Sequence, residues 1–336
     1  MIQINGIRLS REMIQVCQKY PRGSQIGFTP VHRRLSQDRI NMICAGTHSI
    51  SPRTRGSCCL EKKHLKTAEA YGEEGGWDAS LSEVCIVSVY PHHSNVQILL
   101  TLLQIFNRTD IRFRHMVSSN AMISFVIETR FQEEIVSCIR KEALLPDSHT
   151  PFRQDLEEDI SHLLKKYPET RSTYVEEKIK TYGINIYPAL DLFYLNWIPG
   201  NSSSWEPALE SLKKSGVKFL FASAMTSGDI SASARDFGYE FVFLTAGPTD
   251  PLIGQTENQH AGLGESDGQA KADLISFHGP HFGDRYRILD TALSCMDKAG
   301  LPILLTGCTG ASISMVLPAG MGQRGKQALS EGFEAP

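Results

Sequence analysis

A spacing pattern that occurs four times constrains this sequence more than any other feature. Short apolar segments typical of strands begin at Met13, Val84, Leu190 and Leu274. A second such segment follows 27 residues after each of them, at Ile40, Ile111, Val217 and Leu301. An apolar residue five positions before each second segment, followed by a polar or small turn, predicts a helix between the two strands. A repeat at a fixed spacing indicates tandem copies of one structural unit.

The second and fourth copies continue in the same way, which defines the rest of the unit. Both have a third predicted strand that begins with Ile-Ser-x-Val, at Ile123 and at Ile313. A segment of helical character follows each one, over residues 131–144 and 322–333. The unit is therefore β-α-β-β-α, and one more strand would complete the ferredoxin-like arrangement. The predicted fold class is α+β.

The repeat divides the chain into four units. We expect unit A over residues 1–76, unit B over 82–145, unit C over 185–272 and unit D over 273–336, with a helical linker over 146–184. Unit C is degenerate, because a polar run rich in Gly, Asp, Gln and Glu, residues 247–272, replaces its second helix. We expect that run to be a mobile and dispensable surface loop. Pairing of A with B and of C with D, side by side, would cover the exposed sheet edges.

Composition and charge exclude several classes of protein. The formal net charge is −3 and the pI is about 6.4. Basic residues are scattered along the sequence, so we expect no binding to nucleic acid and none to an anionic membrane. No apolar run is long enough to cross a bilayer, and the first residues do not resemble a secretion signal. We therefore expect a cytoplasmic protein.

The eight cysteines suggest neither a metal centre nor a disulfide framework. No Cys-x-x-Cys spacing occurs, and Cys58 and Cys59 are adjacent, so they would point to opposite faces of a strand. Cys17, Cys44, Cys85 and Cys138 fall at apolar positions. We interpret them as small buried side chains and predict no metal site.

Three matches to catalytic motifs fail on context. Residues 264–268 fit Gly-x-Ser-x-Gly, but they lie in a polar run without the strand and helix that a nucleophile elbow needs. Residues 320–325 fit Gly-x-Gly-x-x-Gly, and Gln327 stands where a phosphate-binding loop needs Ser or Thr. A glycine-rich turn is the favoured interpretation there, with phosphate binding as the minor alternative. Asp284, His281 and Cys308 could be drawn as a catalytic cluster, but spacing alone does not support it. We predict no catalytic residues and no cofactor.

A resemblance to a known family adds to this interpretation. In unit D it is carried by residues 292–303, 311–317 and 327–333, and in unit B by residues 106–113 and 117–126. These segments resemble ACT domains, the ligand-binding modules of amino-acid metabolism, and in particular the tandem C-terminal regulatory domains of aspartokinases. The likeness covers most of B and D, part of A and, weakly, C. No segment resembles the Lys-Phe-Gly-Gly strand and turn of the aspartokinase kinase domain, so the resemblance implies regulation without catalysis.

The resemblance also implies where a ligand would bind. In the family, amino-acid effectors bind between paired units, where the loop from the first strand to the first helix meets strand two of the neighbour. A helix N-terminus offers free N–H groups to a carboxylate, and glycines let the backbone approach a ligand. The candidate ligand-binding residues of the unit D loop are Gly279, His281, Gly283, Asp284 and Arg285. Those of unit B are Ser94, Asn95, Ser118 and Ser119.

Each candidate also has a structural interpretation. Asp284 could hold an ammonium group or only cap the helix, and Arg285 could pair with a carboxylate. Gly279 and Pro280 could form only a turn, and Ser118 and Ser119 could only end a strand. His278 and His281 are spaced like a metal pair, but they lie in a loop without a third ligand nearby in the sequence.

Three functions remain open on the sequence. The first is a non-catalytic regulatory protein that binds a small amino acid. The second is a stand-alone regulatory subunit or partner of an aspartokinase or another enzyme of amino-acid biosynthesis. The third is an enzyme with a site that we do not recognise. A homodimer formed through the sheets of the ACT units is a further expectation.

Overall fold

The computed structural model describes residues 1–20, 29–49, 54–75, 79–109, 111–146, 178–198, 205–226, 238–247, 270–280, 282–283, 286–310 and 312–336. Unit A consists of β3 (Met13–Tyr20), α1 (Thr29–Gln37), β4 (Cys44–His48), β5 (Thr54–Glu61), the 3-10 helix η1 (Lys62–His64) and α2 (Leu65–Gly75). Unit B consists of β6 (Ala79–Tyr90), α3 (Val96–Arg108), β7 (Phe113–Ser118), β8 (Ile123–Glu128), η2 (Thr129–Phe131), α4 (Gln132–Glu142) and β9 (Ala143–Leu144).

The second half of the chain repeats this order. Unit C consists of β11 (Gly183–Trp197), α6 (Glu206–Lys214), β12 (Lys218–Thr226) and β13 (Tyr239–Ala246). Unit D consists of β14 (Ala270–His278), α7 (Ile288–Lys298), β15 (Leu305–Cys308), β16 (Ser312–Pro318), α8 (Gly322–Leu329) and β17 (Phe333–Glu334). Three strands precede the units, namely β1 (Ile2–Gln3), β2 (Gly6–Leu9) and β10 (Ile179–Lys180).

All four units share one strand order. In each, the third strand lies between the first and the second, giving β3-β5-β4, β6-β8-β7, β11-β13-β12 and β14-β16-β15, all antiparallel. The predicted α+β fold, built from ferredoxin-like βαββα units that pair side by side, is confirmed. The short strands β9 and β17 follow the last helices, but they pair with β1 and β10 and not with the large sheet.

The units pair through two kinds of edge. Their first strands pair unit A with unit B through β3 and β6, and unit C with unit D through β11 and β14, as predicted. In addition, unit A pairs with unit D through β4 and β15, where Gly46 lies opposite Gly307. Unit B pairs with unit C through β7 and β12, where Val117 lies opposite Ser223. These second-strand pairings were not predicted, because the spacing pattern contains no information on which second strands meet.

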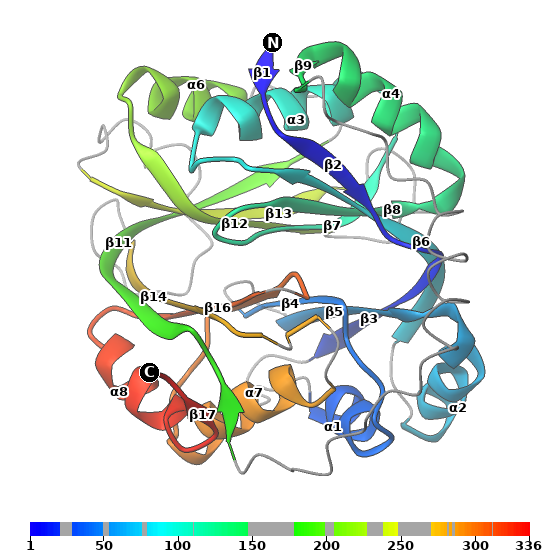
Figure 1. Ribbon diagram of the computed structural model, residues 1–336, viewed down its shortest axis with the longest axis vertical. Helices are drawn as coiled ribbons and strands as arrows, with labels where there is room; N and C mark the ends of the chain where they lie inside the picture. Colours follow the sequence, from blue (N-terminus) through cyan, green and yellow to red (C-terminus); the bar gives the residue numbers. More distant parts are fainter. Residues whose placement is uncertain are drawn as a thin grey trace.

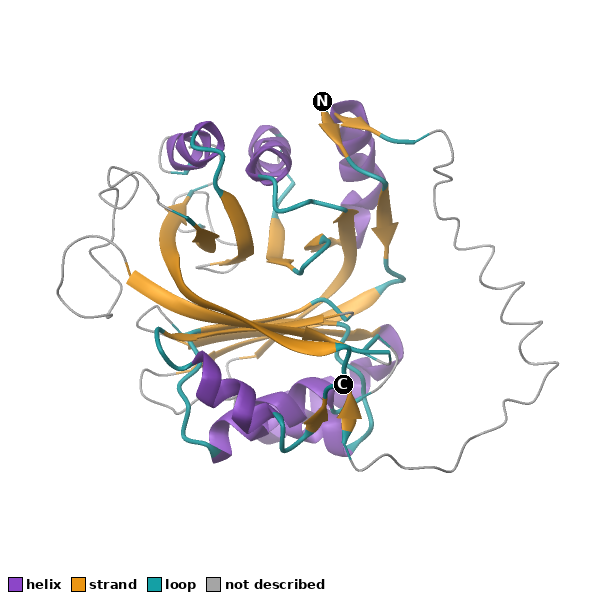
Figure 2. Ribbon diagram, turned by 60° about the vertical axis from the view of Figure 1, so that its left-hand side comes forward, coloured by secondary structure: helices purple, strands orange, loops and turns teal. Residues whose placement is uncertain are grey.

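The A–D pair and the B–C pair form two layers that stack face to face, with their helices on the outside. Figure 1 shows α3, α4 and α6 above one layer of strands and α1, α2, α7 and α8 below the other, and Figure 2 shows the two layers edge-on. The long strands β6 and β11 contribute to both layers, because β6 pairs with β3 and β8, and β11 pairs with β14 and β13. One hydrogen-bonded strand order therefore runs through both layers, which the sequence did not predict.

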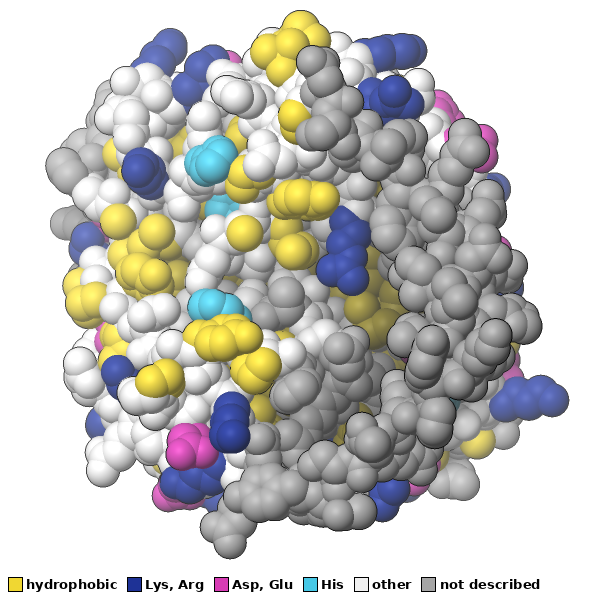
Figure 3. Space-filling view, viewed as in Figure 1, with side chains coloured by type: hydrophobic (Ala, Val, Ile, Leu, Met, Phe, Trp, Pro, Cys, Tyr) yellow, Lys and Arg dark blue, Asp and Glu magenta, His cyan; other side chains and the backbone are white. Residues whose placement is uncertain are grey.

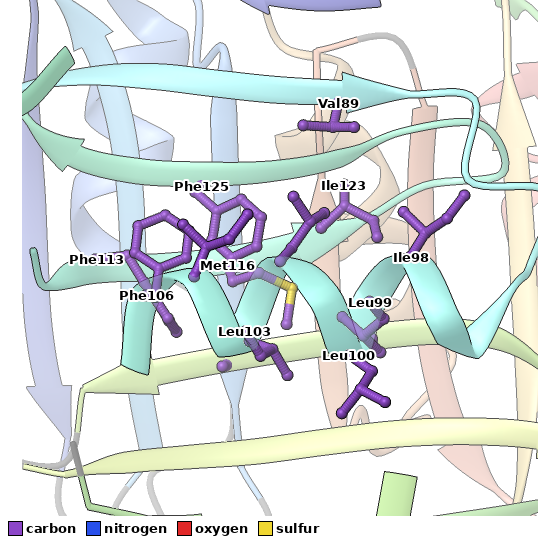
Figure 4. Close-up of a cluster of buried hydrophobic side chains, with 14 of the residues drawn as sticks. Val89, Ile98, Leu99, Leu100, Leu103, Phe106, Phe113, Met116, Ile123 and Phe125 are labelled. Atoms are coloured by element: carbon purple, nitrogen blue, oxygen red, sulfur yellow. The ribbon is translucent and has the colours of Figure 1, made fainter. Parts of the chain in front are cut away.

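Three apolar cores hold these layers together. One lies between the upper helices and their sheet, one between the lower helices and theirs, and one between the two sheets. Figure 4 shows the first, in which Leu99, Leu103 and Phe106 of α3 lie among Phe113 and Phe125 of the sheet. Residues 98–103 of α3 are all buried, so this helix is buried on nearly all sides and not on one face alone.

The second strand of each unit begins later than predicted. Ile40 and Leu301 are buried, but they precede β4 and β15 instead of opening them. The backbone N–H of Ile40 donates to the carbonyl oxygen of Leu35 at 2.8 Å, and that of Leu301 donates to Met296 at 3.0 Å. Because these N–H groups close the preceding helix, they cannot take part in a strand ladder.

The expected linker and polar run also need correction. Ile179–Lys180 forms β10 and β11 begins at Gly183, so the end of the expected helical linker is strand. Residues 270–272, which we had placed in the polar run, belong to β14. Residues 147–177 and 248–269 lie outside the described residues, and so do the predictions of a linker helix and of a mobile loop.

Within the described part of the chain, no helix is long and apolar enough to cross a membrane. Lys and Arg side chains lie scattered over the face that Figure 3 shows. All eight cysteines are among the described residues, and none forms a disulfide. Six of them are buried. Of the four that the sequence predicted to be buried, Cys44 and Cys85 are buried, whereas Cys17 and Cys138 are only partly buried.

Candidate functional site

The loop between β14 and α7, residues 279–287, contacts unit A through its described residue Gly283. The side-chain amide of Asn41 donates a hydrogen bond of 2.8 Å to the carbonyl oxygen of Gly283. Next to it, Gly310 lies so close to unit A that an added Cβ would stand 2.8 Å from the carbonyl oxygen of Ile43. Asn41 and Ile43 lead into β4, the second strand of unit A. A first-strand loop therefore meets strand two of the paired unit, as the resemblance implies.

The beginning of this loop is held from the other side. A Cβ added at Gly279 would overlap the carbonyl oxygen of Lys180 and would lie 2.7 Å from the ring of Phe282. A Cβ added at Gly283 would make only an ordinary contact, 3.7 Å from the oxygen of Gly310. Gly279 thus permits a close backbone approach that another residue would block. Gly283 has room beside it.

The helix start differs from the prediction for Asp284. Helix α7 begins at Ile288, and its N-cap residue is Arg287, whose backbone is left-handed with φ of 73° and whose side chain makes no capping hydrogen bond. Asp284 is therefore not the N-cap of α7. The uncapped N–H groups of its first turn carry the positive end of the helix dipole. His281, Asp284 and Arg285 lie outside the described residues.

An aromatic pair stands at the start of the same loop. The rings of Tyr182 and His278 lie 5.3 Å apart, and the side chain of Tyr182 is 62% exposed. The Nδ1 atom of His278 is buried without a hydrogen-bond partner among the described residues. A buried nitrogen of this kind can serve as a hydrogen-bonding group for a ligand. Tyr182 was not among the sequence candidates, because it precedes the first strand of unit C, far from the loop in sequence.

The matching loop of unit B, residues 91–95, is filled by the protein itself. Asn95, and not Ser94, is the N-cap of α3, and its side chain accepts a hydrogen bond from the N–H of Gln97 at 2.8 Å. The imidazole of His92 accepts the N–H of Ser94 at 2.9 Å and bonds the carbonyl oxygen of Ser119 at 2.7 Å.

Phe219 of unit C closes this loop. Its ring stacks on His92 at 4.8 Å, and both side chains are fully buried. Burial lowers the pKa of His92, so the ring is neutral at pH 7. The unit B loop is also shorter than residues 279–287 of unit D. This copy of the arrangement has its polar groups paired and its space filled.

Ser118 and Ser119 make structural contacts. The Oγ atom of Ser118 accepts the backbone N–H of Ala222 in unit C at 2.7 Å. The Oγ atom of Ser119 accepts the N–H of Met122 at 3.2 Å and so closes the turn between β7 and β8. These contacts join strand ends, which is the structural interpretation that the sequence left open.

Several polar side chains are buried between the two sheets. The Nε2 atom of His48 bonds the hydroxyl of Ser223 at 2.8 Å, and an added Cβ at Gly46 would stand 2.7 Å from the ring of His115. A hydrogen bond from Cys59 lowers the pKa of the Cys44 thiol to about 6, against burial, and His115 adds to the effect. No group of three metal-ligating side chains occurs among the described residues.

A pocket of about 560 Å³ lies on the outer face, between α1 and α7. Arg33 pairs with Asp297 across it at 3.4 Å, and His32 contacts Asp290 at 2.8 Å. Arg287, Lys298 and Glu331 complete its charged lining. Both signs of charge are balanced there, so the pocket favours no single class of ligand.

Comparisons with known proteins place the fold. No family model matches the sequence, and no curated protein matches it. Among solved structures, aspartate kinase from Synechocystis superposes with a TM-score of 0.70 at 11% identity, over 98% of this chain and 55% of that one. The chain has an aspartokinase-like fold. It spans about half the length of that kinase. The regulatory subunit of aspartate kinase from Thermus thermophilus aligns over 41% of this chain and 97% of its own, at 16% identity and a TM-score of 0.37.

Proposed function

We propose that this chain is a non-catalytic regulatory protein that binds a small amino acid between units A and D. The carrying observation is the contact of the 279–287 loop with the segment that leads into β4, through Asn41 and Gly283. That is the arrangement in which, by the ACT resemblance, effectors bind. The proposed ligand lies against this loop, where Gly283 is exposed and the N-cap residue of α7, Arg287, makes no capping hydrogen bond.

The chemistry of the loop fits an amino acid. Arg285 is proposed to pair with the ligand carboxylate, since a guanidinium can donate two parallel hydrogen bonds to it. Asp284 is proposed to hold the ammonium group, with His281 beside it. The unit B residues Ser94, Asn95, Ser118 and Ser119 are proposed to have a structural role, because protein groups already satisfy them.

A second candidate is a stand-alone regulatory subunit or partner of an aspartokinase. One observation favours it, namely that almost the whole chain superposes on about half of an aspartate kinase. An aspartokinase assay with and without this chain tests that function. The sheet edges that pair ACT units are already used within the chain, so we propose that any homodimer forms through another surface. The cytoplasmic location stays a prediction.

A thermal-shift screen against the proteinogenic amino acids tests the main proposal. A ligand that binds only the folded state raises its apparent stability by mass action. We expect one or a few amino acids to raise the melting temperature, and calorimetric titration should then give one site per chain. A folded protein that binds none of them would contradict the amino-acid proposal and favour the partner function. Turnover on a metabolite panel would contradict the non-catalytic part.

A further inference from the structure

The two halves of the chain repeat each other contact by contact. In the first half, the N–H of Ile4 donates to Leu144 at 3.2 Å and the N–H of Asn5 donates to Tyr90 at 2.8 Å. In the second half, Thr181 donates to Glu334 at 2.8 Å and Tyr182 donates to His278 at 2.9 Å. The parallel pairs β1–β9 and β10–β17 are equivalent in the same way. Each half therefore has the same two-unit arrangement in the part of the chain that the structure describes.

Within a half, the units do not pair through their second strands. The first half has the edges of β4 and β7, and the second half has those of β12 and β15. Each of these edges is covered by a strand of the other half, β4 by β15 and β7 by β12. A separated half would expose two unpaired strand edges, which attract other strands. The complementary half is the partner that covers both at once.

Buried side chains also connect the two halves. Arg55 of unit A pairs with Glu240 of unit C at 3.2 Å, with side chains only 13% and 6% exposed. The backbone N–H of Phe113 in unit B donates to the hydroxyl of Tyr239 in unit C at 3.1 Å, and their rings stack at 4.1 Å. Separation would expose these groups and break their pairing.

Polar contacts of unit D with units B and A complete the interface. Ser276 of unit D donates to the side-chain oxygen of Asn120 in unit B at 2.9 Å. His32 of unit A contacts Asp290 of unit D at 2.8 Å. The candidate ligand site also lies between the halves, because Asn41 belongs to the first half and Gly283 to the second.

We infer that residues 1–146 and 178–336 are complementary binding partners, and that this single chain is the fused equivalent of a two-subunit assembly. The interface consists of the β4–β15 and β7–β12 ladders and the buried contacts between them. It holds the halves together without the covalent connection through residues 147–177. Within each half, the β3–β6 and β11–β14 ladders join the two units, so each half is connected internally as well as to the other half.

Cleavage of the folded full-length chain between the two halves tests this inference. A protease recognition sequence is inserted between residues 147 and 177, and each end of the chain carries a different affinity tag. After complete cleavage, judged on a denaturing gel, we expect both fragments to copurify on either tag and to elute at the volume of the uncut protein. The urea midpoint of the cut protein should rise with protein concentration, since its unfolding has become bimolecular. The midpoint of the uncut protein should not.

A matched pair of variants tests the interface itself. Glu240→Gln removes a charge that crosses between the halves, whereas Glu128→Gln alters the Arg114–Glu128 pair within unit B. In the cut protein, we expect Glu240→Gln to raise the dissociation constant of the fragments roughly tenfold or more, and Glu128→Gln to leave it nearly unchanged. Fragments that separate on cutting, or that form assemblies of one fragment only, would overturn the inference. An equal effect of both variants would overturn the role of this interface.

Discussion

Asn41 of unit A and Gly283 of unit D are joined by a hydrogen bond of 2.8 Å, although 242 residues separate them in the sequence. The bond fixes the position of the 279–287 loop relative to the segment that enters β4. A loop that is held in place before a ligand arrives loses less conformational freedom on binding. Asn41 is therefore expected to support ligand binding without touching the ligand.

Asn41→Ala should weaken binding of the amino-acid ligand. The lost bond contributes roughly 0.5–1.5 kcal/mol, the usual net value for a hydrogen bond. Because the bond is exposed, the melting temperature of the free protein should change little. Calorimetric titration and thermal melts measure the two effects. Asn5→Ala, at an exposed asparagine away from this loop, is the control, and equal affinity in both variants would contradict this role of Asn41.

Gly279→Ala should destabilise the protein and distort the start of the loop. The new methyl group would overlap the backbone oxygen of Lys180, which cannot move aside as a flexible side chain could. Overpacking of this kind typically costs about 1–3 kcal/mol. Gly283→Ala is the matched control, since the nearest contact of a methyl group there, among the described residues, is 3.7 Å from the oxygen of Gly310. Urea denaturation of both variants tests the difference, and equal midpoints would show that residues 279–283 can shift freely.

The contact between the two sheets can be tested at Gly46. A Cβ at this position would stand 2.7 Å from the ring of His115 in the opposite layer, so Gly46→Ala should lower stability by roughly 1–3 kcal/mol. In a His115→Ala background the same change should cost clearly less, because the ring that it strikes is gone. Such non-additivity is the mark of residues in contact. Additive costs in a double-mutant cycle would place the strain elsewhere.

The units and their pairing along the chain could be predicted from the sequence, and the A–D and B–C pairings could not. Strands such as β8 and β16 follow from the phrase Ile-Ser-x-Val, and α3 follows from its apolar residues. Which edges meet depends on side chains that touch only after folding. Gly46 and Gly307 lie opposite each other in the ladder between β4 and β15, and no local pattern in the sequence marks that contact.

The candidate site could be predicted only in part, because some of its residues come from distant parts of the chain. The 279–287 loop follows from the strand and helix that flank it. Asn41 reaches that loop through the A–D pairing, Tyr182 through the pairing of β11 with β14, and Gly310 from another loop of unit D. Had the A–D pairing been known, the repeat would have pointed to Asn41, which directly follows Ile40 at the expected start of strand two.

Stability should fall in mild acid because of His48. Burial lowers the pKa of His48 well below its ordinary value, and electrostatic repulsion from the neighbouring His115 and Arg55 adds to the effect. The unfolded chain takes up a proton near pH 6.5, whereas the folded protein does not. Stability is therefore complete above about pH 6.5 and decreases as the pH falls below it, by at most about 1.4 kcal/mol per pH unit for this one group.

His48→Gln should make the pH dependence between pH 5 and 6.5 less steep, because the variant has one fewer group that takes up a proton on unfolding. Urea midpoints measured across this range decide the point. His93→Gln, at an exposed histidine, is the control and should leave the slope almost unchanged. If the slope of the His48 variant equals that of the wild type, other buried groups, such as His92, govern the acid sensitivity.

Arg285 and Asp284 test the proposed function most directly. If Arg285 pairs with the ligand carboxylate, Arg285→Ala should weaken binding by roughly 1.5–3 kcal/mol, the range for hydrogen bonds to charged groups. Asp284→Asn keeps the size and polarity of the side chain but removes its charge. It should lower affinity for an ammonium group while leaving stability unchanged, because the N-cap of α7 is Arg287 and not Asp284. Calorimetric titration of the wild type and both variants, with thermal melts as the stability control, measures both effects. Equal affinity in all three proteins would place the ligand outside this loop.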